Sequence, residues 1–295
     1  MNTSTLENSI DGYIRKLEEK NMSPATVDAY SCDAKQYINF LESNSKNTID
    51  INTIANLEFY IKTLNTRICE NSLRRKIISL KHFISYLLKS ELNINYKTPQ
   101  HIPSRIESNP YEFNDELIKK CILHLNSGEV VLKKYRDLAI FSLLSLEGLK
   151  VTELINLKVK DIKTVGENLY VEIRGSKQRG FIVQKQTGEH LKDYISYLER
   201  TEFSFDLDHL FLGFKGANIG KVAPSMTRHG VKFFINELSD QINEKLCAEK
   251  LRQHAIFHHI SLGKTIVELM QHFGLRQPGV IQKYFNLEKK NEPKR

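Results

Sequence analysis

The stretch RDLAIFSLLSLEGLKVTELINLKVKDI, residues 136–162, decides the fold of the second half of the chain. Its apolar side chains recur at helical spacing as far as Leu146, and Gly148 is the residue type that most often ends a helix. A second, shorter helical pattern covers 151–157. We therefore expect helices over 135–146 and 151–157, joined by a tight turn at Gly148.

A small β-region is expected next. The segments NLYVEI (168–173) and FIVQ (181–184) are strand-like, and they flank RGSKQRG (174–180), whose glycines fit a hairpin turn. Helical patterns cover 116–125, 189–198, 225–242 and 252–285, the last with breaks near Gly263, Gly274 and Pro278. This half is therefore predicted to be mainly α-helical with one small β-sheet and a basic hairpin turn.

The first half of the chain is helical in pattern from 6 to 92. Ser23 followed by Pro24 predicts a sharp helix start, because serine caps a helix and proline fits its first turn. A short helix is expected over 53–64 and a longer, basic one over 72–88. Three prolines between 97 and 110 predict an extended linker. We therefore expect a helical domain at 1–96, a linker at 97–110 and a second domain at 111–295.

Composition excludes several classes of protein. The 43 Lys+Arg against 35 Asp+Glu give a net charge of +8, and 40% apolar content suffices for a core, so collagen-like and disordered chains are excluded. No run of about 18 apolar residues is present, and the N-terminus is polar, which predicts a cytoplasmic protein without a membrane span. The four widely spaced cysteines predict buried free thiols: Cys32, Cys69, Cys121 and Cys247.

Several segments together resemble the tyrosine recombinase (phage integrase) family, over almost the whole chain. They are SPATVDAYSCDAKQYINFL (23–41), NSLRRKIISLKHFISYLLKSELN (71–93), the 136–162 stretch, the basic hairpin, HAIFHH (254–259) and a Gly-x9-Tyr pattern ending at Tyr284. The resemblance implies a helical, SAM-like core-binding domain that clamps DNA, followed by a domain with the recombinase catalytic fold. It also implies that double-stranded DNA is the partner.

In that family a tyrosine hydroxyl attacks a DNA phosphate. Two arginines bind the nonbridging oxygens, a hairpin lysine protonates the departing 5′ oxygen, and histidines complete the donors. By resemblance the family positions are occupied here by Lys150, Arg174, His254, Phe257, Leu275 and Tyr284. Only His254 and Tyr284 match the family in identity, and a shift of one residue would place Lys177 rather than Arg174 at the lysine position.

These replacements predict that catalysis is lost. Lys150 keeps the charge of the first arginine but lacks the paired N–H donors of a guanidinium group. Phe257 has neither a charge nor a hydrogen-bond donor. Arg174, at the lysine position, cannot readily act as an acid. Loss of an arginine that stabilises a phosphoryl transition state costs about 10³ to 10⁵ in rate in other enzymes. No catalytic residue is therefore expected, although His258 or Arg252 could replace the lost phosphate contacts.

The leading hypothesis is a sequence-specific DNA-binding protein that is not an enzyme, such as a transcriptional regulator or phage lysogeny repressor. Its alternative is a divergent, active recombinase that uses Tyr284, and a scaffold that does not bind DNA is a third hypothesis. The predicted DNA contacts are Arg74, Arg75, Lys76, Lys81, Lys150, Arg174, Lys177, Arg179, Arg228, Arg252, His254 and His258.

No cofactor is expected. His254, His258 and His259 lack the His-x3-His spacing that puts two ligands on one helical face, so no metal is expected either. A homodimer on DNA and a peptide or protein antagonist are left open, and the protein is expected to be DNA-associated.

Overall fold

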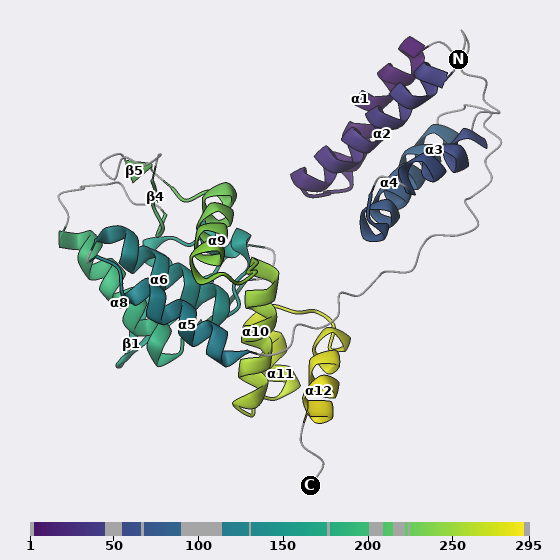
Figure 1. Cartoon of the computed structure of the whole chain (residues 1–295). Coiled ribbons are helices and arrows are strands. Elements are labelled where there is room, and N and C mark those ends of the chain that lie inside the picture. Colours follow the sequence, from purple (N-terminus) through teal and green to yellow (C-terminus); the bar gives the residue numbers. More distant parts are fainter. Residues whose placement is uncertain are drawn as a thin grey trace. The chain divides into compact units, whose positions relative to one another are not determined.

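The computed structural model describes residues 3–44, 55–65, 68–89, 114–129, 131–175, 178–200, 209–214, 222–223 and 225–291. The chain divides into two compact units, Met1–Ser108 and Asn109–Arg295 (Figure 1). The linker expected at 97–110 lies outside the described residues. In the part of the chain that the structure describes, no helix is long and apolar enough to cross a membrane.

The N-terminal unit is built from helices. They are α1 (Thr3–Glu19), α2 (Pro24–Asn44), α3 (Ala55–Asn65) and α4 (Glu70–Lys89). Ser23 caps α2 as predicted, because its Oγ accepts the backbone N–H of Thr26 at 3.3 Å. The apolar faces of the helices close on a core in which Tyr13 packs edge-on against Phe83, with ring centroids 5.1 Å apart.

A buried carboxylate joins α2 to α4. The side chain of Asp33 is only 3% exposed, and it lies 2.7 Å from Arg75 Nη1 and 2.9 Å from Lys76 Nζ. Lys76 also donates to Gln36 Oε1, and it is buried rather than part of an open basic face. The amphipathic pattern of α4 therefore predicted the helix correctly, but two of its cations stabilise the helix pair.

The C-terminal unit is mainly helical and carries a small sheet. Its elements are α5 (Asp115–Asn126), α6 (Leu132–Ser145), α7 (Val151–Ile155), the 3-10 turn η2 (Val159–Asp161), β1 (Ile162–Val165), β2 (Asn168–Ile173), β3 (Arg179–Ile182), α8 (Lys185–Arg200), β4 (Gly213–Phe214), β5 (Val222–Ala223), α9 (Arg228–Ile242), α10 (Ala248–Ser261), α11 (Ile266–Phe273) and α12 (Gly279–Asn291). Helix α6 is buried along almost its whole length and packs on α5, α7, α8 and α10.

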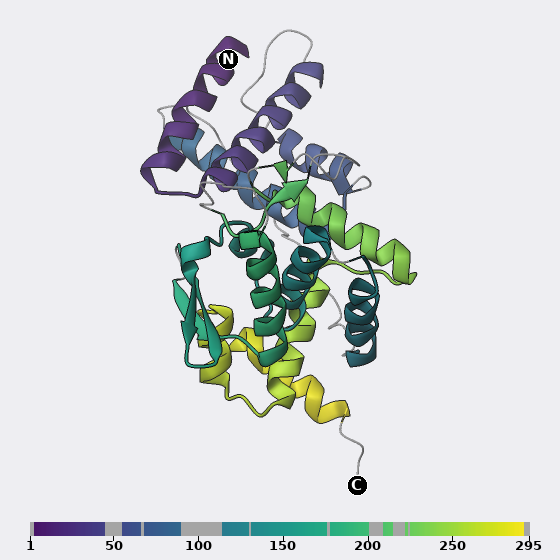
Figure 2. The same ribbon diagram turned by 90° about the vertical axis from the view of Figure 1, so that its left-hand side faces the viewer.

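The antiparallel sheet has the order β1-β2-β3. Strand β2 has the predicted bounds, and Val171 lies opposite Ile162 on one side and Phe181 on the other. The second hairpin strand begins at Arg179, two residues earlier than predicted. Strand β1 was not predicted, because it is an edge strand whose last three residues are exposed and show no apolar alternation. Figure 2 shows α11 beside this sheet, and α11 contacts β3.

The predicted breaks in the last helical region are confirmed. Gly263 and Gly274 adopt φ of 79° and 60°, and α11 begins with a capping box between Thr265 and Glu268. Helices α10, α11 and α12 share a small core of their own around Phe273 and Ile281. The last three helices therefore form a cluster that positions Tyr284, on α12.

We expect Asp33→Asn to destabilise the N-terminal unit by about 3 kcal/mol, because it leaves the ammonium of Lys76 buried without its counter-charge. Thermal unfolding of the full chain followed by circular dichroism should show a lower first transition, and hydrogen exchange within 24–44 should become faster. Asp28→Asn, at an exposed position of the same helix, is the matched control. Equal effects of the two changes would contradict a stabilising role for Asp33.

Candidate active site

Three cationic side chains from different elements converge on Glu153, near the start of α7. Both carboxylate oxygens of Glu153 accept hydrogen bonds from Arg179 of β3, each at 3.0 Å. Arg252 of α10 places Nη1 4.0 Å from Glu153 Oε2. Lys150, the N-cap residue of α7, places Nζ 3.9 Å from Oε1 and donates its backbone N–H to Oε2. We call these four residues the Glu153 cluster.

The Glu153 cluster has an excess of positive charge. Burial alone would raise the pKa of Glu153, but the hydrogen bonds from Arg179 and from the Lys150 backbone hold it below its usual value. The carboxylate is therefore ionised at neutral pH, and it faces three cations. Arg179 and Arg252 have side chains 8% and 14% exposed, whereas that of Lys150 is 39% exposed. Such a cluster can bind an anion from solvent.

Two glycines allow the cluster to form. Gly148 has a φ of 66°, its carbonyl accepts a hydrogen bond from Arg252 Nη1, and a Cβ there would lie 2.6 Å from the ring of Phe273. Gly274, with a φ of 60°, ends α11, and a Cβ there would lie 2.9 Å from Arg179 Nη1. Both positions need a left-handed backbone and close approach, which only glycine combines without strain.

Tyr284, on α12, is half buried and lies near enough to Arg252 of the cluster to interact with its charge. Its ring meets that of Phe257 edge-on, with centroids 5.1 Å apart. Burial raises the pKa of the Tyr284 hydroxyl, the charge of Glu249 raises it further, and the charge of Arg252 lowers it. Arg252 therefore acts electrostatically on the tyrosine as well as on Glu153.

The arginine that reaches the cluster is Arg252, five residues before Phe257. Its Nη2 donates to the backbone carbonyl of Phe273 at 2.7 Å, and burial lowers its pKa. Phe257 is 7% exposed and packs against Tyr284, and Leu275 packs in the core of α10, α11 and α12. The resemblance places Phe257 at the arginine position of the HxxR pattern, but Arg252 is the residue of α10 that approaches Glu153 in the structure.

His254 and His258 contact other parts of the protein. Nδ1 of His254 lies 2.9 Å from the carbonyl of Ser145, and its Nε2 lies 3.1 Å from Asp115 Oδ1. Nε2 of His258 lies 3.0 Å from Gln184 Oε1, and burial lowers the pKa of His258. Both histidines thus tie α10 to its neighbours, and neither is a member of the Glu153 cluster.

The remaining predicted contacts are distributed over both units. Arg174 follows β2 and donates from Nε to Asp161 Oδ1 at 2.5 Å, which raises the pKa of Arg174. Arg228 begins α9 and is exposed, and Lys177 lies outside the described residues. On α4, Arg74 and Lys81 are half buried, Arg75 is exposed and ion-paired, and Lys76 is buried.

Sequence reasoning missed Glu153 and Asp161, which orient the two hairpin arginines. Each is the acid of a capping box, three residues after Lys150 and Lys158 respectively. That spacing was a readable signal. It predicts a helix start, however, and not the second role of each carboxylate as the partner of an arginine from the hairpin.

Chemically, the site combines a phenol with an anion-binding cluster. Forked guanidinium groups and an ammonium stabilise negative charge that develops on phosphate or carboxylate oxygens. A half-buried tyrosine hydroxyl beside them is a candidate nucleophile. Attack by the hydroxyl on a bound phosphate is therefore the reaction that the arrangement suits.

Comparison with protein families gives two matches. The model described as "Phage integrase, N-terminal SAM-like domain" matches residues 10–91, and the model described as "Phage integrase family" matches residues 116–291. Among individual proteins, the chain is 26% identical over 278 residues to the tyrosine recombinase XerC of Staphylococcus aureus (strain USA300 / TCH1516). That alignment covers 91% of this chain and 89% of the relative.

Solved structures share the fold. The XerH site-specific recombinase bound to palindromic difH substrate, in a post-cleavage complex, has a TM-score of 0.71 at 16% identity, covering 98% of this chain and 82% of that chain. The Tn1549 transposon integrase in complex with transposon right end DNA has a TM-score of 0.69 at 12% identity, covering 98% and 99%. At these identities the likeness establishes the architecture only.

The prediction that the chain is not an enzyme is wrong. Relatives aligned over nine-tenths of the chain are named as tyrosine recombinases, and the catalytic-domain model matches residues 116–291, so the comparisons point to an enzyme. The predicted fold, mainly α-helical with a small sheet and a SAM-like domain before a recombinase catalytic domain, is confirmed. The chain belongs to the phage integrase family, whose two characteristic domains account for residues 10–91 and 116–291.

Proposed function

We propose that the protein is a site-specific tyrosine recombinase that cleaves double-stranded DNA with the hydroxyl of Tyr284. The observation that carries the proposal is the convergence of Lys150, Arg179 and Arg252 on one carboxylate beside that tyrosine. In the reaction, the Tyr284 hydroxyl loses its proton to water, and its oxygen attacks a DNA phosphorus to form a phosphotyrosyl ester. The bond to the 5′ oxygen breaks, and that oxygen leaves with a proton.

Arg252 is proposed as the second phosphate-binding arginine. This choice moves the HxxR pattern five residues toward the N-terminus, so that it becomes Glu249-Lys250-Leu251-Arg252. Glu249 then stands where the family has a histidine. The shift is supported by geometry, because Arg252 approaches Glu153, whereas Phe257 is buried against the tyrosine ring.

Lys150 is proposed to bind the same phosphate as a point charge. Its side chain is the most exposed of the three cations, whereas Arg179 is held by Glu153 and by the carbonyl of His272 at 2.7 Å. For the proton that the leaving oxygen needs, we favour Lys177 over Arg174. A lysine can donate a proton, whereas the guanidinium of Arg174 keeps its own beside Asp161.

Double-stranded DNA is the proposed partner, and the XerH and Tn1549 proteins named above were solved with DNA. A net charge of +8 suits such a partner. Assembly of two copies on DNA is part of the proposal, because strand exchange joins two cleaved duplexes.

We expect Tyr284→Phe to abolish cleavage and leave DNA binding unchanged, since only the nucleophilic oxygen is lost. DNA duplexes that the full chain selects from a random library should be synthesised again with a nick in one strand. The short fragment released by cleavage then diffuses away, and the covalent product accumulates. The wild-type protein should then give a covalent adduct that survives denaturing electrophoresis. Specific binding without any adduct from the wild-type protein would refute the proposed reaction and favour a regulator.

Removal of the Arg252 charge should slow adduct formation by about 10³-fold or more, because the phosphate loses a forked donor. Arg252→Gln tests the charge, and Arg252→Lys tests the fork while keeping the charge. Circular dichroism and DNA affinity show whether each variant is folded. Arg200→Gln, at an exposed position of α8, is the matched control and should cleave normally. If Arg252→Gln cleaved like that control, the register of the arginine would be wrong.

Cleavage should become faster as pH rises above neutral. Because burial raises the pKa of Tyr284, only a small fraction of the hydroxyl is ionised at neutral pH. This fraction grows as the pH rises toward the pKa. Glu249→Gln removes a charge that raises this pKa, so it should move the rate profile to lower pH. Single-turnover rates across a pH series measure this effect, with Glu199→Gln as an exposed control. A slower Glu249→Gln enzyme at every pH would instead assign Glu249 a direct part in proton transfer.

A further inference from the structure

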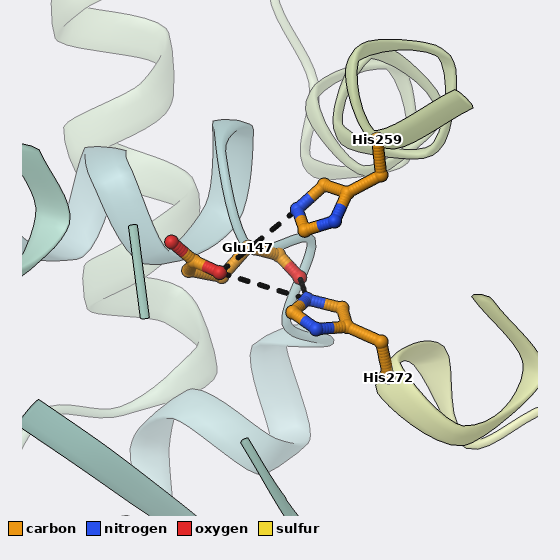
Figure 3. A group of neighbouring side chains, drawn as sticks. All are labelled: Glu147, His259 and His272. Atoms are coloured by element: carbon orange, nitrogen blue, oxygen red, sulfur yellow. Dashed lines mark hydrogen bonds and ion pairs between the residues drawn. The ribbon is translucent and has the colours of Figure 1, made fainter. Parts of the chain in front are cut away.

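A second cluster of polar side chains lies in the interior, next to the loop that carries Lys150. It consists of Glu147 from the loop after α6, His259 from α10 and His272 from α11, and all three side chains are buried (Figure 3). The ligand-type atoms of the three residues lie within 4.8 Å of one another. We call them the buried triad.

One oxygen of Glu147 has no hydrogen-bond donor. Oε1 accepts the backbone N–H of Gln184 and the hydroxyl of Thr187, each at 2.9 Å. Oε2 is buried without a hydrogen-bond partner and lies between the two rings, 3.6 Å from His272 Nε2 and 4.0 Å from His259 Nε2. A buried carboxylate oxygen left in this state is costly, so a ligand at this point would stabilise the domain.

The two imidazole nitrogens next to Oε2 lie within hydrogen-bond distance of backbone carbonyls, which can only accept, so in the ion-free structure each nitrogen carries a proton. Nε2 of His259 lies 2.9 Å from the carbonyl of Leu146, and Nε2 of His272 lies 3.1 Å from the carbonyl of Glu147 itself. Binding of an ion through Nε2 requires the other tautomer of each neutral ring, with its proton on Nδ1. Burial raises the pKa of Glu147 to about 7, and the hydrogen bonds from Gln184 and Thr187 and the charge of Lys264 offset this only in part.

We propose that the buried triad binds a divalent transition-metal ion of the Zn²⁺ type, through Glu147 Oε2 and the Nε2 atoms of His259 and His272. Two neutral imidazoles and one carboxylate are a donor set that Zn²⁺ accepts. Bonds of about 2.0 to 2.2 Å allow ligand atoms to be up to about 4 Å apart across one ion. The two distances from Oε2 satisfy that limit, and small ring movements bring the nitrogens within it.

The ion would have a structural role, because the site is closed to solvent. It would link the end of α6 to α10 and α11, which lie far from α6 in the sequence. The loop that it fixes continues through Gly148, whose carbonyl binds Arg252, to Lys150. Metal binding would therefore fix the backbone of the loop that carries Lys150 into the Glu153 cluster.

Cobalt provides a direct test on the full, tag-free chain. After chelator treatment, titration with Co²⁺ near neutral pH should produce a visible absorption band that saturates at one equivalent and is removed by Zn²⁺. Zn²⁺ should also raise the midpoint of thermal unfolding, since it binds only the folded state. Elemental analysis of the protein as purified should find a comparable amount of transition metal.

Variants separate the triad from surface sites. Glu147→Gln and His272→Gln should each weaken Co²⁺ binding by about 100-fold or more, since a direct ligand matters at least as much as its outer-shell partners. His124→Gln, which removes an exposed histidine of α5, should bind Co²⁺ like the wild type. The proposal is overturned if the folded wild-type protein gives no band and no shift in unfolding. It is also overturned if Glu147→Gln, shown folded by circular dichroism, binds Co²⁺ as tightly as His124→Gln.

Discussion

Arg179 and Arg252 carry like charges into one largely buried region of the C-terminal unit, and Glu153 is the group that allows both to stay there. The bidentate pair with Arg179 satisfies the carboxylate, and the same carboxylate reduces the repulsion between the two guanidinium groups. Without it, β3 and α10 would bring unpaired charges together. The rest of the site depends on this interaction, because Lys150, Gly148 and Tyr284 are positioned around the two arginines.

The same carboxylate also begins a helix. Glu153 accepts the backbone N–H of Lys150 and completes the capping box of α7, so the residue that organises the cations also fixes the backbone of the lysine. Asp161 repeats this arrangement one element later, where it caps η2 and accepts a hydrogen bond from Arg174. Local capping and long-range charge pairing are therefore provided by single side chains, and the hairpin is attached to the helices through them.

Charge neutralisation by a buried acid recurs in the N-terminal unit. Asp33 binds Arg75 and Lys76, and it thereby withdraws part of the positive charge of α4 from solvent. A count of Lys and Arg along a helix overstates the charge that such a helix offers to a phosphate backbone. For a family whose members act on DNA, the exposed cations rather than the total number set the electrostatic attraction.

The sequence by itself determined the helical units, the hairpin, the glycine breaks and the family, because each depends on local periodicity or on residues at fixed spacing. It pointed to Tyr284, Lys150 and the candidate Arg252 for the same reason. It did not determine that Arg252, and not residue 257, meets Glu153, since both lie on one helix and only the packing of α10 against α6, α11 and α12 decides which side chain enters the cluster. The buried triad is the clearest case: Glu147, His259 and His272 are separated by more than one hundred residues at their extremes, and their spacing matches no linear metal motif. Only the folding of α6, α10 and α11 against one another brings the polar atoms of the three residues together. The apolar faces of these helices determine how the helices pack, and that packing sets the positions of the polar side chains.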